Sequence, residues 1–191
     1  MSHAPTDRHG ESNLEKFILL SPTDLAALPE PTWLIDGVLP SHGFCVLYGE
    51  PGSGKTFVAL SIALSVAADH CWCGKHTLGG MVLYVAAEGL YGLKLRVEAY
   101  QKKHDLRAEN IRYLGVAFNL LNEDVETLLA TLQAAGIRPD LIVLDTLARL
   151  MLGADENSAK DMGLAIAGMD RVRQETGATV LVIHHTRKTG E

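Results

Sequence analysis

A glycine-rich segment matches the phosphate-binding pattern G-x-x-x-x-G-K-[ST] at each fixed position, and it reads Gly49-Glu50-Pro51-Gly52-Ser53-Gly54-Lys55-Thr56. Glycines in such a loop allow positive φ angles and let backbone N–H groups approach a phosphate chain closely. The Lys55 ammonium would reach the β and γ phosphates, and the Thr56 hydroxyl would ligate Mg²⁺ at the N-terminus of a helix, whose dipole favours anions. The sequence therefore predicts a site for a nucleoside triphosphate, formed by these residues and the adjacent Phe57.

The residues on either side of this loop support the prediction. Residues 43–48 form a short apolar run typical of a buried strand, and residues 56–68 have the pattern of a helix. A glycine-rich surface turn is the structural alternative, and this strand–loop–helix context disfavours it.

The composition indicates a single globular domain. The chain has 191 residues, of which 47% are hydrophobic and 21% are charged, so it can form an ample core. No apolar run is long enough for a membrane span, and the N-terminus lacks the apolar region of a signal peptide, so we expect a cytoplasmic protein with no membrane partner. A formal net charge of −6 excludes the overall basic character of a dedicated nucleic-acid-binding domain.

Two groups of polar residues have an ordinary interpretation that we prefer to a functional one. The cluster His70, Cys71, Cys73 and His76 resembles metal ligands, but it lacks a partner pair elsewhere, so an ordinary loop is favoured. Basic residues also gather in one segment, where a solvated helix face is favoured over a nucleic-acid contact: Lys94, Arg96, Lys102, Lys103 and Arg107.

The chain divides into three regions by composition. Residues 1–13 are polar and are expected to be a disordered tail. Residues 14–42 form a lead-in punctuated by prolines, in which Trp33 is expected either beside the nucleotide or as a core anchor. Residues 43–191 are expected to form the nucleotide-binding core.

Within this core, apolar runs alternate with helical patterns. After the first strand and helix, strands are predicted at 81–86, 111–114, 141–145 and 179–183, with helices from about residues 90, 122 and 158. The alternation predicts an α/β fold, a three-layer sandwich with a mainly parallel central sheet. In such sheets ligands bind at the carboxyl ends of the strands.

Polar residues follow three of these predicted strands. Asp145 ends the run L-I-V-L-D and has the form of a Walker B acid, which would hold Mg²⁺ opposite Thr56; a turn aspartate is the alternative. Thr146 and not an acid follows it, so the general base would come from a neighbouring strand end, where Glu88 lies; an exposed turn glutamate is its alternative. Either His184 or His185 could donate a hydrogen bond to the γ-phosphate.

Several motifs together resemble the RecA-like, AAA-type ATPase core of the RepA-type hexameric replicative DNA helicases. They are G-E-P-G-S-G-K-T, V-A-A-E-G, L-I-V-L-D-T-L-A-R, D-E-N-S-A-K-D-M and V-I-H-H-T-R-K, within residues 32–191. The resemblance implies Lys55, Glu88 and His185 as catalytic groups and Thr56 and Asp145 as Mg²⁺ ligands. It also implies ATP as substrate, a homo-hexamer, single-stranded DNA as partner, and a strand order in which the strand ending at His184 lies between those ending at Gly49 and Asp145.

The sequence departs from that family pattern in one respect. The family core continues with further strands, DNA-contacting loops and an arginine finger, so the resemblance implies a core that is incomplete at its C-terminus. Arg149 and Arg187 lie beside motifs of the same subunit and are poor candidates for such a finger.

We therefore expect a P-loop ATPase that couples hydrolysis to movement on single-stranded DNA as part of a replicative helicase, with weak activity in this chain. The first alternative is a RecA-like ATPase of recombination or regulation without helicase activity. The second is a nucleotide-binding assembly module with little turnover. A P-loop kinase is disfavoured, because neither an arginine-rich lid nor an acceptor site is evident.

Overall fold

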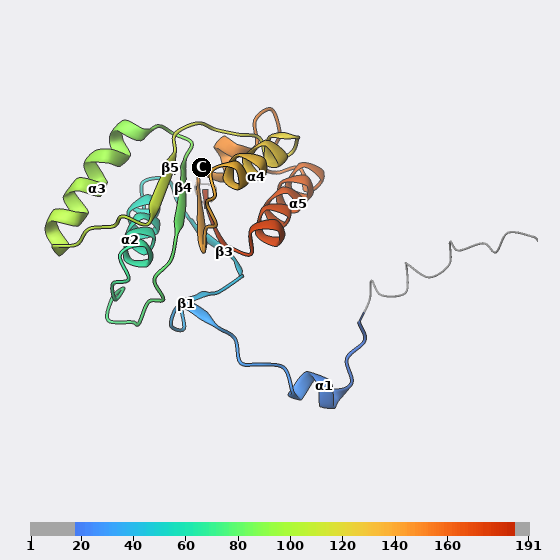
Figure 1. The fold of residues 1–191 in the computed structure, drawn as a ribbon. Coiled ribbons are helices and arrows are strands. Elements are labelled where there is room, and N and C mark those ends of the chain that lie inside the picture. The colour runs from blue at the N-terminus through green and yellow to red at the C-terminus, as the bar shows by residue number, and fades with distance from the viewer. Residues whose placement is uncertain (1–17, 186–191) are drawn as a thin grey trace, which may run out of the picture. The chain divides into compact units, whose positions relative to one another are not determined.

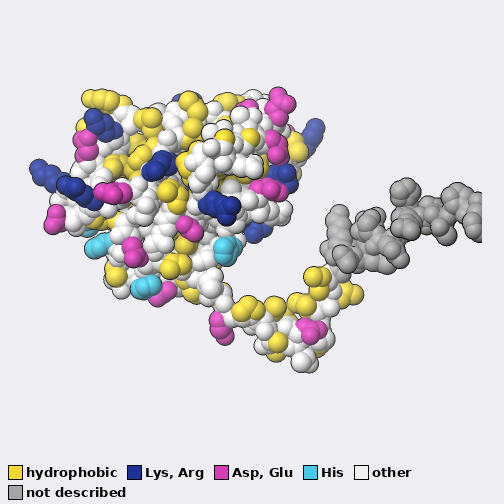
Figure 2. All heavy atoms as spheres, viewed as in Figure 1, with side chains coloured by type: hydrophobic (Ala, Val, Ile, Leu, Met, Phe, Trp, Pro, Cys, Tyr) yellow, Lys and Arg dark blue, Asp and Glu magenta, His cyan; other side chains and the backbone are white. Residues whose placement is uncertain are grey.

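We describe residues 18–185 of a computed structural model, in which the chain divides into two compact units, Met1–Pro31 and Thr32–Glu191. The expected disordered tail, residues 1–13, lies outside the described residues. In the first unit, α1 (Pro22–Ala26) is capped by Ser21, whose hydroxyl accepts a hydrogen bond from the Asp24 backbone N–H. Every described residue of this unit is exposed, including a set of apolar side chains (Figure 2): Ile18, Leu19, Leu20, Leu25 and Leu28.

The second unit is built on a parallel sheet of five strands in the order β3-β7-β6-β4-β5. The strands are β3 (Phe44–Gly49), β4 (Val82–Ala86), β5 (Ile111–Leu114), β6 (Leu141–Asp145) and β7 (Thr179–His185). The predicted parallel sheet is confirmed, but the prediction that its first strand is buried is wrong, because β3 is an edge strand of the described sheet that exposes Phe44, Val46 and Tyr48. The implied position of β7, between β3 and β6, is confirmed as well.

Helices cover both faces of this sheet, as Figure 1 shows. On one face lie α2 (Lys55–Ala67) and α3 (Leu90–His104), and on the other lie α4 (Asp124–Ala134) and α5 (Ala159–Thr176). Side chains alternate between the two faces along each strand, so β6 contributes Leu141 and Val143 to the first core and Ile142 and Leu144 to the second. The predicted three-layer α/β sandwich is confirmed.

A small antiparallel sheet precedes the main one. It consists of β1 (Trp33–Ile35) and β2 (Leu39–Pro40), and both belong to the second compact unit. The expectation that Trp33 could anchor the core is wrong, because this residue is 36% exposed. The next two residues, Leu34 and Ile35, are buried in its place. Leu34 and Ile35 are buried although they are consecutive, because the pairing of β1 with β2 is irregular between Trp33 and Ile35.

The helix ends largely follow the expected capping chemistry. The Ser158 hydroxyl accepts a hydrogen bond from the Asp161 N–H at 3.3 Å, and Gly177 ends α5 in a left-handed conformation with φ 71°. The helix α4 begins at Asp124, and the Asn122 side chain accepts a hydrogen bond from the Asp124 N–H at 2.9 Å. The segment after Asp145 contains a short 3₁₀ helix, η2 (Leu147–Leu150).

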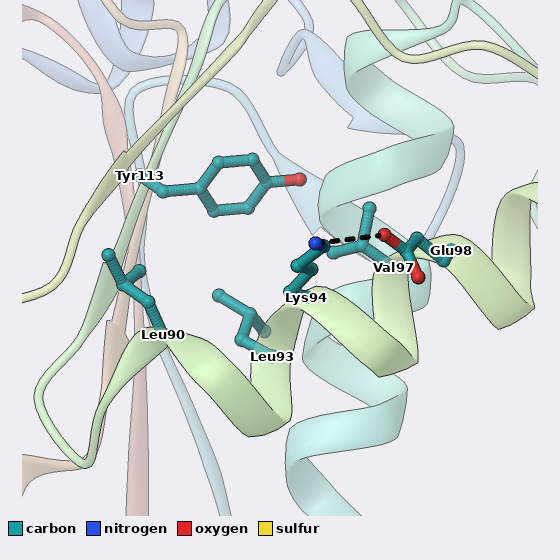
Figure 3. Close-up of a pocket in the computed structure, with 6 residues that line it drawn as sticks. All are labelled: Leu90, Leu93, Lys94, Val97, Glu98 and Tyr113. Carbon is teal, nitrogen blue, oxygen red and sulfur yellow. Dashed lines mark ion pairs between the residues drawn. The ribbon is translucent and has the colours of Figure 1, made fainter.

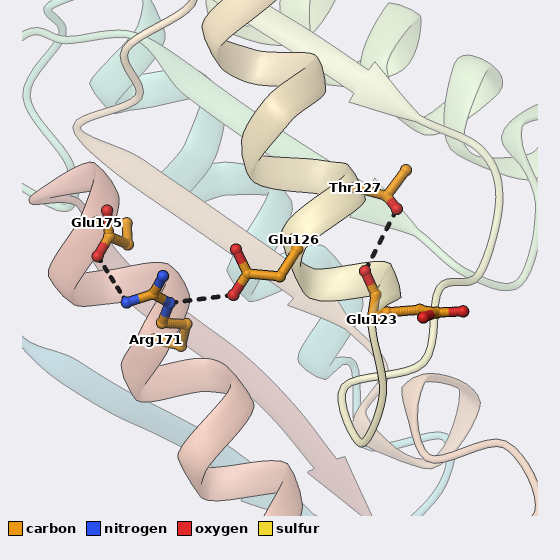
Figure 4. A network of polar contacts seen from close by, with 5 residues as sticks. All are labelled: Glu123, Glu126, Thr127, Arg171 and Glu175. Carbon is orange, nitrogen blue, oxygen red and sulfur yellow. Dashed lines mark hydrogen bonds and ion pairs between the residues drawn. The ribbon is translucent and has the colours of Figure 1, made fainter.

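A polar network joins α4 to α5 on the surface (Figure 4). The Arg171 guanidinium lies 3.1 Å from a carboxylate oxygen of Glu126 and 2.8 Å from one of Glu175. These side chains are about half exposed, so solvent screens both ion pairs and they add little to the stability of the fold. Within the described part of the chain, no helix combines the length and the apolar character that a bilayer crossing requires.

The close approach of α5 to the segment before α4 depends on Gly168. A Cβ at this position would lie 2.1 Å from the backbone oxygen of Leu120, whereas a Cβ at Gly163 of the same helix would meet nothing within 4 Å. The backbone of Leu120 is therefore in direct contact with α5 at one glycine and not at the other.

We predict opposite effects of alanine at these two positions. Gly168→Ala should lower the free energy of unfolding by about 1–3 kcal/mol, because backbone atoms must shift. Gly163→Ala should raise it by about 0.5–1 kcal/mol, because alanine costs less conformational entropy in a helix. Urea unfolding followed by circular dichroism measures both, and equal effects of the two substitutions would contradict the packing described here.

Candidate nucleotide-binding site

The phosphate loop connects the end of β3 at Gly49 to the start of α2 at Lys55. Gly52 and Gly54 have φ angles of 80° and 87°, in the left-handed region. A Cβ at either glycine would meet no atom within 4 Å, so the backbone conformation, and not lack of space, requires glycine here. The loop therefore has the shape in which successive N–H groups surround an anion at a helix N-terminus.

The Lys55 side chain is folded into its own loop. Its ammonium donates hydrogen bonds to the carbonyl oxygens of Gly49 at 2.8 Å and Glu50 at 2.6 Å, and the residue is only 6% exposed. A buried ammonium is stable only with such partners. The charge is thus held at the base of the loop, where phosphate oxygens would replace the carbonyls as partners.

The ends of α2, β4 and β6 meet at Asp145. Its Oδ1 lies 3.3 Å from the Thr56 hydroxyl, and its Oδ2 accepts a hydrogen bond from the Tyr84 hydroxyl at 2.8 Å. A hydroxyl and a carboxylate at this separation are the oxygen ligands that Mg²⁺ prefers, with phosphate and water completing its coordination. The predicted pair Thr56 and Asp145 is therefore brought together, and its donors fit the metal.

Burial controls the charge of this carboxylate. Asp145 is 7% exposed, and removal from water raises its pKa, while the hydrogen bonds from Tyr84 and Thr56 lower it. The nearby Glu88 carboxylate raises the pKa further by like-charge repulsion, and Arg96 lowers it. Burial and the Asp145 charge also raise the pKa of Tyr84, so its phenol stays protonated and donates. A divalent cation would relieve the buried negative charge.

Glu88 lies on the exposed turn that follows β4. This turn is fixed to β6, because the Ala87 N–H donates to the Asp145 carbonyl at 2.9 Å and Ala86 pairs in register with Asp145. The carboxylate is therefore at the same sheet edge as the phosphate loop and is open to solvent, as a residue that positions a water must be. Its role as general base stays a prediction.

The two histidines end β7 on opposite faces of the sheet. His185 pairs in register with Gly49, and it shares a face with Leu181 and Ile183, the face that α2 covers. His184 pairs with Tyr48 on the other face, where its Nδ1 lies 3.4 Å from Glu156 Oε2. Of the two, His185 is thus the histidine on the side of the phosphate loop, and its contact with the γ-phosphate stays a prediction.

Sequence reasoning missed three residues of this region: Tyr84, Arg96 and Glu156. Tyr84 is the one polar side chain in an otherwise aliphatic strand, a signal that is present in the run V-L-Y-V-A. The Arg96 guanidinium lies 5.2 Å from the centre of the Phe57 ring. Phe57, directly after the phosphate loop, therefore makes a cation–π contact with Arg96 of α3. Glu156 belongs to the motif D-E-N-S-A-K-D-M, but its contact with His184 gave no local signal because the two residues are distant in the sequence.

The structure also describes the cysteine cluster, the basic segment and Arg149, which the sequence singled out. Cys71 and Cys73 are exposed, and within residues 18–185 no group of three or more His, Cys, Asp or Glu side chains is arranged to hold a metal. In the basic segment Lys94 lies 3.7 Å from Glu98 in an exposed ion pair. Arg149 is exposed on η2, and Arg187 lies outside the described residues.

This sheet order, with the phosphate loop between β3 and α2 and the buried Asp145 at the end of β6, defines a RecA-like P-loop ATPase. The family comparison extends over nearly the whole chain, with residues 11–191 matching an AAA domain. The chain therefore belongs to this family of AAA domains.

Individual known proteins match a smaller part of the chain than the family comparison does. The DNA repair and recombination protein RadB from two strains of Halobacterium salinarum is 30% identical over 140 residues, 72% of this chain and 54% of RadB. The chain thus spans about half the length of the curated relatives it matches. The KaiC-like protein PH0186 from Pyrococcus horikoshii OT3 shares the fold, with a TM-score of 0.55 and 18% identity over 82% of this chain and 67% of that one.

These comparisons correct part of the expected family. They support a RecA-like P-loop ATPase, but not the RepA-type replicative helicase that the motifs resembled, because the relatives named here are a recombination protein and a KaiC-like protein. A phosphate loop and a buried aspartate suit many uses of ATP, so these residues alone do not separate unwinding from the others.

We predict that Lys55→Ala weakens the binding of fluorescent ATP by about 10- to 100-fold, the loss expected for charge-assisted hydrogen bonds. Lys160→Ala, an exposed lysine of α5, is the matched control and should leave the dissociation constant unchanged. Fluorescence titration measures both, with circular dichroism to verify folding. Equal affinities of the two variants would exclude the loop as the phosphate site.

Proposed function

We propose that this chain is the ATP-binding and ATP-hydrolysing core of a RecA-like ATPase that acts in DNA recombination or repair. The observation that carries the proposal is the contact between Thr56 Oγ1 and Asp145 Oδ1 at 3.3 Å, with Glu88 at the same sheet edge. This arrangement supports turnover over mere nucleotide storage, since it combines a phosphate loop, a metal-binding pair and an acid able to contact water.

Each of these residues would have a defined task. Lys55 and the N–H groups of the loop would bind the β and γ phosphates, while Thr56 and Asp145 would hold Mg²⁺. When bound, Mg²⁺ supplies positive charge that offsets the negative charge developing on the phosphates. Glu88 would orient a water molecule for in-line attack on the γ-phosphate and accept its proton. His185 would donate a hydrogen bond to the γ-phosphate and so register its presence.

The role in recombination is drawn from the likeness to RadB, which is named a DNA repair and recombination protein. It corresponds to the first alternative that the sequence left open, and it replaces the replicative helicase as our main proposal. We keep single-stranded DNA as a partner because RadB is named a DNA repair and recombination protein, and we keep a homo-hexamer from the resemblance of the motifs. The cytoplasm is the compartment in which we place this activity.

We predict that Glu88→Gln lowers the rate of phosphate release by about 10²- to 10⁴-fold, because it removes the general base but keeps the side-chain volume. ATP affinity should change little. Glu109→Gln serves as the control, since Glu109 is also exposed but precedes β5, at the opposite end of the strands. A phosphate-release assay compares the variants with the wild type. Equal rates for wild type and Glu88→Gln would remove Glu88 from this role.

A second measurement separates recombination from unwinding. We expect single-stranded DNA to raise the ATP hydrolysis rate of the wild type, and a forked DNA duplex to remain unseparated in the presence of ATP. ATP-dependent strand separation that is lost in Lys55→Ala would restore the helicase hypothesis. A hydrolysis rate that single-stranded DNA leaves unchanged would contradict the DNA partner but not the ATPase.

A further inference from the structure

The Tyr84 hydroxyl is a buried polar group that contacts the site but has no task in the proposed function. Tyr84 lies in the middle of β4 and is 0% exposed, surrounded by the aliphatic core that α2 covers. Its hydroxyl donates a hydrogen bond to Asp145 Oδ2 at 2.8 Å. A buried phenol needs a partner, and here the partner is a carboxylate that binds the metal in the proposed function.

The two oxygens of Asp145 are divided between two hydroxyl groups. Oδ2 is taken by Tyr84, inside the sheet, whereas Oδ1 faces Thr56 at the start of α2. Rotation of the carboxylate would break the Tyr84 hydrogen bond and leave a buried donor without a partner, which is unfavourable. The carboxylate is therefore fixed with one oxygen turned toward the phosphate loop.

We propose that Tyr84 is a positioning residue, which orients Asp145 so that Oδ1 is presented to a divalent cation bound with the nucleotide. The inference rests on the proposed function, because it assigns Asp145 to Mg²⁺. Groups that hydrogen-bond to a metal ligand fix its orientation, and their loss lowers metal affinity by about 10- to 100-fold. Tyr84 reaches Asp145 from the neighbouring strand, so the sheet itself sets the orientation.

The chain contains a matched tyrosine that lacks this contact. Tyr113 pairs in register with Tyr84 on the adjacent strand β5, and the two ring centres are 6.3 Å apart. Among the described residues, its hydroxyl has no hydrogen-bond partner. Figure 3 shows that the Tyr113 ring extends over α3 near Leu93 and Lys94. Phenylalanine at either position removes one hydroxyl group from the same core. Only the Tyr84 hydroxyl contacts Asp145.

The test compares Tyr84→Phe with Tyr113→Phe. Protein freed of metal with EDTA is mixed with fluorescent mant-ADP, and Mg²⁺ is titrated while nucleotide binding is followed. We expect Tyr84→Phe to raise the Mg²⁺ concentration at half-saturation by about 10- to 100-fold, with metal-free nucleotide affinity within about twofold of wild type. Tyr113→Phe should leave both values unchanged. A purely structural role of the hydroxyl would lower thermal stability without moving the Mg²⁺ midpoint.

The outcomes separate this inference from the function on which it rests. A wild-type protein whose mant-ADP binding does not depend on Mg²⁺ overturns the proposed metal site. A wild type that depends on Mg²⁺, together with an unchanged midpoint in Tyr84→Phe, overturns only the positioning role.

A second variant keeps Tyr84 in place, should its removal prevent folding. The chain has five tyrosines, and Tyr84 remains alone when phenylalanine replaces the others: Tyr48, Tyr91, Tyr100 and Tyr113. Labelled with 3-fluorotyrosine, this protein should give a fluorine resonance that shifts when Mg²⁺ is added to the ADP complex. The shift should be absent in an Asp145→Asn version. A resonance that Mg²⁺ leaves unmoved overturns the positioning role.

Discussion

The contact between α2 and the end of β6, made by Thr56 and Asp145, is the constraint on which the site depends. It links two elements that are far apart in the sequence and forms only when the sheet has its observed order. Insertion of β7 between β3 and β6 separates the phosphate loop from the buried aspartate by one strand, and the first turn of α2 crosses that space. The parallel direction of all five strands places Gly49, Asp145 and Glu88 at one edge.

Local signals explain why much of the fold and site is predictable from sequence. The phosphate loop is a contiguous pattern, and β6 is a buried apolar run that ends in an aspartate, so sequence patterns alone place Lys55, Thr56 and Asp145 at strand and helix ends. The alternation of strands and helices predicts the parallel sheet in the same way. The position of β7 between β3 and β6 came from family resemblance and not from spacing, because no local pattern encodes strand order.

The features that sequence did not predict depend on contacts between distant segments. Tyr84 resembled an ordinary core residue of β4, since its partner Asp145 lies on β6, 61 positions later. The contact of His184 with Glu156 requires the segment between η2 and α5 to fold back toward the end of β7. Trp33 was misplaced because an aromatic residue in a short strand faces inward or outward according to register, and its three-residue strand provides too few positions to define an alternation.

The pairing of β3 with β7 has a consequence for the order of folding. Among the strands of the described sheet β3 pairs only with β7, although residues 50–178 of the chain separate the two strands. Local strand–helix units around β4, β5 and β6 involve shorter chain closures, which form faster than distant ones. The strand that carries the phosphate loop would therefore join the sheet late, once β7 has been made. A nucleotide that binds the completed loop would then favour the last step of folding, in addition to serving as substrate.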